Sequence, residues 1–391
     1  MYDLAVIGAG VAGSYVAYRL AGRGYEVAVF EEHDKIGEPI QCSGIVGAEC
    51  FRRFPLFQGT VLREVKSATL FSPSGRELRL RRDSVQAYVL DRAAFDRALA
   101  EKAQQQRAHY FSGVRVGDIA ILDDRVRVKT EGVKGIFDAK TAVIASGFGS
   151  ALPRKLGLGR VGDFIVGAQA EVGTDGSGEI EVYFDQELAP GFFAWFVPTT
   201  DNRALVGLFS RRTPGLYLKS LLSSLFSQGK IATPDVQTTY GGIPLRPLTR
   251  TYRERVLVVG DAAGQVKPTS GGGIYYGLLC AEMASDTLHQ ALSSNSFSQR
   301  LFARYQRDWK QKIGRELRLG YLARRLYGRL DNHHIDQIFD ILASKGVLDS
   351  LLKSPDISFD WHGDIIVSGL RQLAPWHQLF GWTKDALRGK A

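Results

Sequence analysis

The chain has 391 residues, of which 45% are hydrophobic, so it can bury more than one core and we expect two or three structural parts. Its three cysteines, Cys42, Cys50 and Cys280, show no Cys-x-x-Cys spacing, which argues against a disulfide framework, a metal site or an iron–sulfur cluster. No run of about 18 uncharged apolar residues is present, and Asp3 interrupts any signal-like start. These features predict a cytoplasmic protein that does not span a membrane and binds no metal.

A glycine motif follows the first apolar segment. Residues 3–7 have the composition of a short strand, and Gly8-x-Gly10-x-x-Gly13 comes next, with apolar residues at helical spacing behind it. Such glycines give a tight turn and let the backbone approach a pyrophosphate, which then faces a helix N-terminus. The motif predicts a dinucleotide-binding βαβ unit that contacts its ligand through Gly8, Gly10, Ala12 and Gly13.

Acidic residues end the second strand of this unit, which we expect over residues 25–30. A carboxylate at this place can accept hydrogen bonds from ribose hydroxyl groups. We expect Glu31 to do so, with Glu32 as the alternative.

Two further segments are expected near the same ligand. Asp91 is suited to cap a helix, and Arg92 in its first turn either reaches the cofactor or lies on the surface. Residues 141–147 form another apolar strand, whose small residues at the end allow close approach of the backbone to a cofactor. These small residues are Ala145, Ser146 and Gly147.

A second glycine-rich region favours FAD over NAD as the resident dinucleotide. An apolar strand ends in Gly260-Asp261, the pattern by which FAD proteins hold the far end of the cofactor, and Gly271-Gly272-Gly273-Ile274 follows. The chain lacks a second Gly-x-Gly-x-x-Gly in a strand–helix context. NADPH must therefore bind in another way, or a redox protein supplies the electrons.

The middle of the chain predicts a second domain. From residue 164 to 208, β-branched and aromatic residues alternate between Gly, Asp and Pro, which is typical of antiparallel strands.

The positive charge is concentrated in residues 299–330, which hold ten Lys or Arg against two acidic residues and so account for +8 of the net charge of +9. Aromatic and apolar residues recur every four positions from Tyr305 to Tyr321, which predicts a basic amphipathic helix. Its basic face is either simply solvated or attracts anionic lipid headgroups or a phosphorylated substrate. No nucleic-acid motif accompanies it. Aromatic residues that would add membrane affinity follow at Trp361, Trp376, Phe380 and Trp382.

Three motifs together give the chain a resemblance to the flavin-dependent geranylgeranyl reductase family, over roughly residues 1–330. They are Pro39-Ile40-Gln41-Cys42-Ser43-Gly44, the aromatic segment 191–198, and the long Gly-Asp segment 260–277. The aromatic segment departs from the family's Tyr-x-Trp-x-Phe-Pro, with Phe193 for Tyr and Val197 for Phe. The resemblance implies an α/β fold: a Rossmann-like FAD-binding domain, an antiparallel-sheet substrate domain of the hydroxylase-like type and a helical C-terminal region.

The resemblance implies reduction of isolated double bonds in a geranylgeranyl chain carried by a lipid or an isoprenoid diphosphate. Reduced FAD offers hydride at N5, so the protein must position an alkene, exclude water and supply a proton. Cys42, in a loop with Ser43 and Gly44 near the cofactor, is the candidate catalytic residue, although a buried inert cysteine is the usual case. Phe193, Trp195 and Pro198 are expected to contact the prenyl chain, or else to be ordinary sheet core.

These expectations divide the chain into six segments. FAD-binding parts are expected at 1–65, 91–160 and 251–298, substrate-domain parts at 66–90 and 161–250, and a helical region at 299–391. A flavin monooxygenase or halogenase would share this fold and both glycine segments. A prenyl-binding protein without catalysis is the third alternative, and intact flavin motifs argue against it.

Overall fold

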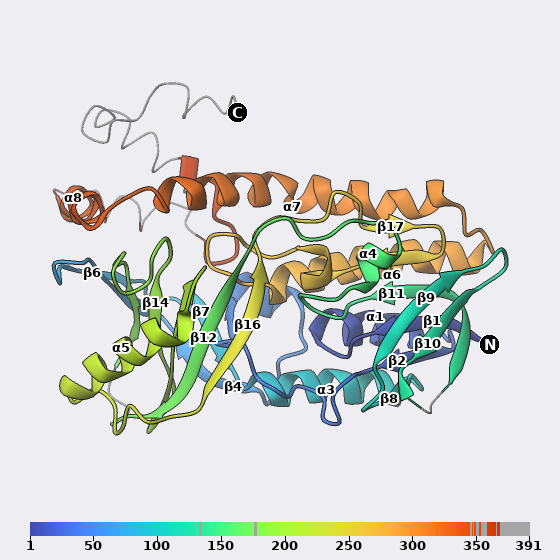
Figure 1. The fold of residues 1–391 in the computed structure, drawn as a ribbon, viewed down its shortest axis with the longest axis horizontal. Coiled ribbons are helices and arrows are strands. Elements are labelled where there is room, and N and C mark those ends of the chain that lie inside the picture. Colours follow the sequence, from blue (N-terminus) through green and yellow to red (C-terminus); the bar gives the residue numbers. More distant parts are fainter. Residues whose placement is uncertain are drawn as a thin grey trace.

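The computed structural model describes residues 1–132, 135–175 and 178–344, together with 346, 348, 352, 358–364, 366 and 367. Its β-strands form a cofactor sheet, a substrate sheet and a small third sheet. Figure 1 shows the cofactor sheet on the right and the substrate sheet on the left, with one long helix, α7, running over both.

The cofactor sheet is parallel at its centre. Its strands in order are β17 (Tyr252–Arg253), β18 (Val256–Val258), β11 (Ile136–Ile144), β1 (Tyr2–Ile7), β2 (Val27–Phe30) and β8 (His109–Phe111). In addition, β10 (Val126–Thr130) pairs with β11, and β9 (Val116–Ile121) pairs with β10. Val6 of β1 lies opposite Val143 on one side and Val29 on the other. The central strands are buried on both faces, which explains their continuous apolar sequence.

Helices cover the cofactor sheet. One face packs against α1 (Val11–Ala21), α3 (Arg92–Gln105) and α6 (Ile274–Ser293), while the other packs against β9, β10 and the short α4 (Leu152–Lys155). Asp91 caps α3 as predicted, since its Oδ1 accepts a hydrogen bond from the Ala94 amide at 2.9 Å. The last strand leads into a 3₁₀ turn, η2 (Gly260–Ala263).

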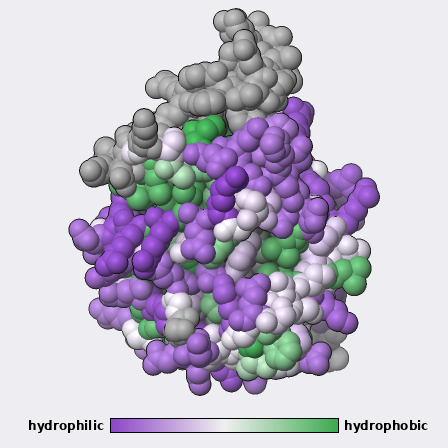
Figure 2. Space-filling model, turned by 90° about the vertical axis from the view of Figure 1, so that its left-hand side faces the viewer, coloured by the Kyte–Doolittle hydropathy of each residue, from purple (hydrophilic) through white to green (hydrophobic). Residues whose placement is uncertain are grey.

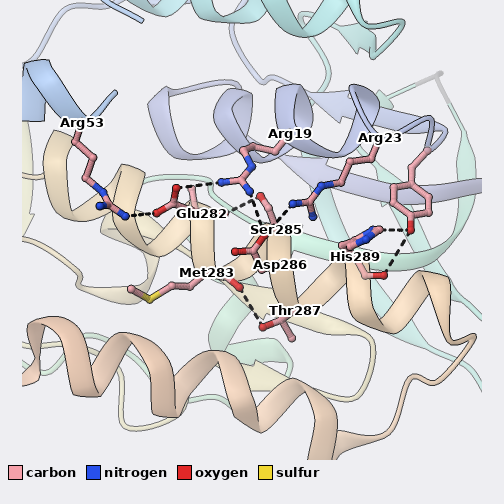
Figure 3. Close-up of polar contacts among 11 residues, drawn as sticks. Arg19, Arg23, Arg53, Glu282, Met283, Ser285, Asp286, Thr287 and His289 are labelled. Atoms are coloured by element: carbon pink, nitrogen blue, oxygen red, sulfur yellow. Dashed lines mark hydrogen bonds and ion pairs between the residues drawn. The ribbon is translucent and has the colours of Figure 1, made fainter. Parts of the chain in front are cut away.

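Ion pairs join α1 and the following loop to α6 on the outside of this half (Figure 3). Arg19 contacts Glu282 at 3.2 Å and Asp286 at 3.0 Å, and Arg23 contacts the same Asp286 oxygen at 3.0 Å. Arg53, from the end of α2 (Ala48–Arg53), reaches the other oxygen of Glu282 at 2.6 Å. These pairs connect segments more than 200 residues apart in the sequence.

The substrate sheet is built from two separate stretches of chain. Its order is β16 (Thr238–Pro244), β12 (Phe164–Gly173), β15 (Arg203–Ser210), β14 (Ala194–Thr200), β13 (Ile180–Tyr183), β5 (Ser67–Phe71) and β6 (Glu77–Arg81). Neighbouring strands are antiparallel except at the junction of the two stretches, where β13 and β5 are parallel. Helix α5 (Pro214–Ser227) covers one face, as Figure 1 shows, and leaves the other face toward the interior of the molecule.

The small third sheet links the two halves. It contains β3 (Ile45–Gly47), β7 (Ala87–Leu90) and β4 (Val61–Val65). Residues 67–81 of the predicted 66–90 segment thus lie in the substrate sheet, whereas β7 pairs with β3 and β4 instead.

Helix α7 (Gln299–Tyr327) is the predicted basic amphipathic helix, and α8 (Asn332–Ala343) follows it. Two buried side chains anchor α7 through hydrogen bonds: Tyr305 donates to the Val258 carbonyl at 3.0 Å and Trp309 donates to Thr251 Oγ1 at 2.9 Å. One basic residue departs from the prediction, because Arg324 lies in the buried row of the helix and not on the exposed basic face. Tyr321 is only half-buried.

Candidate active site

A cavity of about 1340 Å³ lies between the cofactor sheet and the open face of the substrate sheet. Its walls come from the carboxyl ends of β1, β2 and β11, from the loop at 37–45, from the inner face of the substrate sheet and from α7. Ligands of open α/β sheets bind at the carboxyl ends of the strands, so this is the candidate active site.

The glycine motif packs backbone against backbone at the cofactor end of this cavity. Gly8 has φ of +102°, and a Cβ atom there would lie 2.4 Å from the Ala145 carbonyl oxygen, while a Cβ at Gly13 would lie 2.0 Å from the Gly8 carbonyl oxygen. Gly8, Gly10 and Ala12 line the cavity, but Gly13 does not and serves to bring α1 against the turn. No side chain caps α1, so its first amides are available to an anionic ligand.

Both candidate ribose-binding carboxylates line the cavity, but they differ in setting. Glu31 is held at the glycine turn, since its Oε2 accepts a hydrogen bond from the Ala9 amide at 2.8 Å and its Oε1 accepts one from the His33 amide at 3.0 Å. Glu32 is about half exposed and lies 3.5 Å from Arg115. The anchored geometry favours Glu31 for the ribose contact.

Arg92 and Cys42 meet in the cavity wall. Arg92 binds Asp96 at 2.9 Å, its buried Nε has no hydrogen-bond partner, and Cys42 Sγ accepts a bond from the Gly44 amide at 3.4 Å. Burial lowers the pKa of Arg92, but Asp96 and Cys42 outweigh this and raise it above its usual value.

Ser43 also faces the cavity, whereas Gly44 does not. With φ of +72° and a Cβ position only 2.4 Å from the Leu90 carbonyl oxygen, Gly44 instead lets the loop pack on β7. Gly44 thus has a packing role in this loop, and a contact of its backbone with the cofactor stays a prediction.

The second glycine-rich region completes this end of the site, and all its candidate residues line the cavity: Gly260, Asp261, Gly271, Gly272, Gly273 and Ile274. Burial raises the pKa of Asp261 to about 6, although Arg92 lowers it. Ala145, Ser146 and Gly147, which follow the neighbouring strand β11, also line the cavity, and the buried Ser146 Oγ has no hydrogen-bond partner. Uncapped amides, a carboxylate at the turn and unpartnered polar atoms together fit a dinucleotide.

The aromatic segment contributes alternate residues to the cavity. Phe193, Trp195 and Val197 line it, whereas Phe196 and Pro198 do not, because successive side chains of β14 point to opposite faces. The expectation of substrate contact at Pro198 is therefore not supported by its position. Phe209, which the sequence reading missed, lies 4.7 Å from Trp195 between ring centroids and 5.4 Å from Phe193.

Glycines on neighbouring strands shape this aromatic surface. A Cβ at Gly207 would lie 2.4 Å from Trp195 Cζ2, and one at Gly242 would lie 2.1 Å from the Phe148 ring. These glycines inside strands were a usable signal, since glycine within a strand often marks close approach of another group.

A segment near the C-terminus, residues 358–364, closes part of the cavity and was also missed. Ser358, Phe359 and His362 line the cavity. Lys267, almost fully buried, donates to the Phe359 carbonyl at 2.8 Å and lies 3.9 Å from Asp360.

The same segment is fixed to α2 and α6. Asp360 accepts hydrogen bonds from the Glu49 and Cys50 amides at 3.2 and 3.3 Å. Trp361, predicted to add membrane affinity, is half-buried, donates to Glu49 at 2.6 Å and packs on Tyr275. Trp376, Phe380 and Trp382 lie outside the described residues. Burial, and then Lys267, lower the pKa of His362 to about 3, so its ring is neutral at ordinary pH.

Fold and sequence comparisons define the class of protein. Residues 3–58 match the family of FAD dependent oxidoreductases. The fold is similar to a geranylgeranyl bacteriochlorophyll reductase-like protein from Thermoplasma acidophilum, with a TM-score of 0.84, 22% identity and coverage of 97% of this chain and 99% of that one. A p-nitrophenol 4-monooxygenase from Pseudomonas putida follows with a TM-score of 0.70, 16% identity and coverage of 90% and 96%. The chain is an FAD-dependent oxidoreductase with the predicted hydroxylase-like fold.

Curated relatives narrow the class. A digeranylgeranylglycerophospholipid reductase from Methanothermobacter thermautotrophicus is 32% identical, covering 88% of this chain and 92% of the relative. Another from Methanopyrus kandleri is 31% identical, covering 93% and 100%. The chain belongs to the geranylgeranyl reductase family, which confirms the predicted family, the FAD cofactor and an FAD-dependent reductase. Among the described residues, no helix has the length and apolarity to cross a bilayer.

Proposed function

We propose that this enzyme hydrogenates isolated double bonds in the geranylgeranyl chains of a digeranylgeranyl glycerophospholipid or a related isoprenoid diphosphate. The observation that carries the proposal is the single cavity, in which the two glycine regions and the aromatic surface of Phe193, Trp195 and Phe209 are continuous. Its volume of about 1340 Å³ exceeds the 300–1,000 Å³ of ordinary ligand pockets, as expected for a site that holds FAD and a long apolar chain together.

The proposed cofactor contacts are the candidates that line the cavity at the two glycine regions and the loop beside them. They are Gly8, Gly10, Ala12, Glu31, Cys42, Ser43, Arg92, Ala145, Ser146, Gly147, Gly260, Asp261, Gly271, Gly272, Gly273 and Ile274. The N-terminal amides of α6, which begins at Ile274, would stabilise negative charge on a bound flavin.

Reduced FAD supplies a hydride when bound, so the chain must hold the alkene, exclude water and deliver a proton to the neighbouring carbon. The aromatic side chains of the substrate sheet provide the dry surface. We assign proton delivery or substrate orientation to the thiol of Cys42, which lines the cavity beside the Arg92 guanidinium. A positioned general acid contributes roughly 10²–10⁴-fold to a rate.

Cys42→Ala should therefore keep FAD and its reduction by dithionite, while formation of saturated product falls about 100-fold. Flavin absorbance measures the first property and mass spectrometry of the lipid the second. Cys280→Ala is the control, because Cys280 is buried in α6 away from the cavity. Wild-type turnover by Cys42→Ala would show that the thiol only packs.

The function itself is tested with dithionite-reduced enzyme and a digeranylgeranylglyceryl phospholipid under anaerobic conditions. The product should gain two hydrogens for each bond reduced, as read by mass spectrometry. Absence of saturated product, together with oxygen-dependent turnover and hydrogen peroxide release, would favour the monooxygenase or halogenase alternative.

The electron donor and a membrane contact complete the proposal. The sequence has one dinucleotide motif, so either NADPH binds transiently or a redox protein delivers electrons. Peripheral attachment is assigned to exposed cations along α7 that precede its last turn, namely Arg300, Arg304, Arg307, Lys310, Lys312, Arg315 and Arg318. Figure 2 shows that the end of the molecule with α5, β6 and α8 carries apolar patches between hydrophilic groups.

Flotation with anionic and with zwitterionic vesicles tests this attachment. Binding should require anionic lipid and weaken as salt rises, because the Debye length shrinks from about 10 Å at 0.1 M to about 3 Å at 1 M. Charge reversal at Arg307 and Arg318 should abolish it. Equal absence of binding at every salt concentration would refute the attachment.

A further inference from the structure

A buried cation lies in the substrate half of the cavity wall. Arg324 occupies the last turn of α7, is 8% exposed and lines the cavity. The other buried positions of this helix are Phe302, Tyr305, Trp309, Ile313, Leu317 and Gly320. An arginine thus stands at the end of a row that otherwise lacks charge.

Aromatic rings hold the Arg324 guanidinium in place. Its central carbon lies 3.8 Å from the ring centroid of Phe192, 5.5 Å from that of Tyr327 and 5.7 Å from that of Phe193. Stacking of this kind orients the planar group, and cation–π attraction contributes, but neither supplies a counter-charge.

Within the described part of the chain, Arg324 has no ion pair, and its Nε has no hydrogen-bond partner. The neighbouring cation Arg211, in contrast, has a partner: Asp163 binds Arg211 at 2.6 Å and accepts a bond from the Tyr321 hydroxyl at 2.9 Å. Arg211 also lies 5.9 Å from the Phe192 centroid, so two guanidinium groups lie at this ring and, among the described residues, only Arg211 is paired with a carboxylate.

Burial lowers the pKa of Arg324 to about 9, and Arg211 lowers it as well, although Tyr327 raises it. The group therefore still carries its charge at neutral pH. Burying a charge without a partner is costly, which makes the missing anion the feature to explain.

We propose that Arg324 binds a phosphate group of the prenyl substrate and so forms the headgroup subsite of the cavity. A guanidinium presents donors in a planar fork that matches phosphate oxygens. The placement also fits, since Phe193 contacts Arg324 on one side and lies 6.1 Å from Trp195 on the other. A phosphate at Arg324 would leave the attached chain to run along these rings.

This inference rests on the proposed function and adds a consequence to it. An anchored headgroup sets how far along the cavity each double bond can reach, and hence which bonds are reduced. A substrate without phosphate would bind in several registers.

Steady-state kinetics compare geranylgeranyl diphosphate with geranylgeraniol, using dithionite-reduced enzyme. Arg324→Met should raise KM for the diphosphate at least tenfold and leave KM for the alcohol within twofold. Arg325→Met is the matched control, because Arg325 is the exposed neighbour in the same turn, and it should change neither value. If Arg324→Met raised KM equally for both substrates, or changed KM for neither, the assignment would be overturned.

Binding to the oxidised, FAD-loaded enzyme separates this inference from the reductase activity. In calorimetry, wild type and Arg325→Met should bind geranylgeranyl diphosphate at least tenfold more tightly than inorganic pyrophosphate, and Arg324→Met should lose that preference. Equal affinity of wild type for the two ligands would indicate a free phosphate site and overturn the headgroup assignment, as would absence of binding. Wild type that binds but does not reduce the chain would refute the proposed function and leave the subsite standing.

Thermal unfolding provides the folding control. Because Arg324 is a buried charge without a partner, Arg324→Met should melt at or above the wild-type temperature and retain FAD. If it loses FAD, Arg324→Gln replaces it under the same criteria.

Discussion

The cofactor end of the cavity is formed mainly by backbone atoms, whereas the substrate end is formed mainly by large side chains. At the cofactor end, backbone meets backbone, as where a Cβ at Gly13 would fall 2.0 Å from the Gly8 carbonyl oxygen. At the substrate end, large side chains such as Trp195 and Phe209 form the wall and meet ring against ring. A carbon added at Gly13 would therefore meet rigid backbone, whereas shortening a side chain at the second end is expected to leave the fold intact and to change selectivity.

The largest expected effect tests the cofactor end. Gly13→Ala should destabilise the protein by about 3 kcal/mol or more and abolish FAD retention, because overpacking against rigid backbone cannot relax. Gly10→Ala is the control: its Cβ would meet no protein atom within 4 Å, so the apoprotein should unfold at the wild-type temperature. Thermal unfolding of the apoproteins and flavin absorbance of the purified variants measure both. A stable, yellow Gly13→Ala protein would contradict this account.

At the cofactor end, we expect the ionised Asp261 carboxylate to lower the free energy of unfolding of the apoprotein. Its pKa of about 6 in the folded protein exceeds the ordinary value of 3.8, so the folded apoprotein binds the proton more tightly than the unfolded chain. The contribution of protonated Asp261 to the free energy of unfolding is therefore present below about pH 4 and is lost as the pH rises through 6.

Asp261→Asn should therefore stabilise the apoprotein by about 2–3 kcal/mol at pH 8 and by almost nothing at pH 4, at 1.36 kcal/mol per pKa unit. Denaturant unfolding across this pH range measures the difference. Parallel stability curves for the two proteins would refute the shift.

The smallest effect concerns the substrate end. Trp195→Leu should lower kcat/KM for the prenyl substrate about tenfold with FAD binding unchanged, since lost apolar contact is worth 1–3 kcal/mol in substrate selection. Pro198→Ala, on the same strand but outside the cavity lining, should stay within twofold of wild type. A similar loss in both variants would mean that the whole strand, and not its inner face, determines turnover.

The sequence allowed the cofactor end to be predicted more completely than the substrate end. Tight turns and helix caps require particular residue types at particular positions, so the glycine turn and the Asp91 cap could be predicted from the sequence alone. The alternation of side chains between the two faces of a strand can also be read from the sequence. Applied strictly, it would have placed Phe193 and Trp195 on one face and Pro198 on the other.

Helical periodicity would likewise have placed Arg324 with Leu317 and Gly320 in the buried row of α7. Because Arg324 is positively charged, it was counted instead with the exposed basic face of the helix. The contact between Lys267 and Asp360 could not be predicted, because it joins positions 93 residues apart through a loop and a segment with no pattern of their own.

The parallel pairing of β5 with β13 has a consequence for synthesis of the protein. Strand β6 ends about 100 residues before β13 begins, so the β5–β6 hairpin leaves the ribosome roughly 5–20 s before its partner strand. During that interval the β5 edge is unpaired and open to association with other chains. Charged residues at Glu77, Arg79 and Arg81 line the exposed side of the hairpin and would keep such a nascent chain soluble.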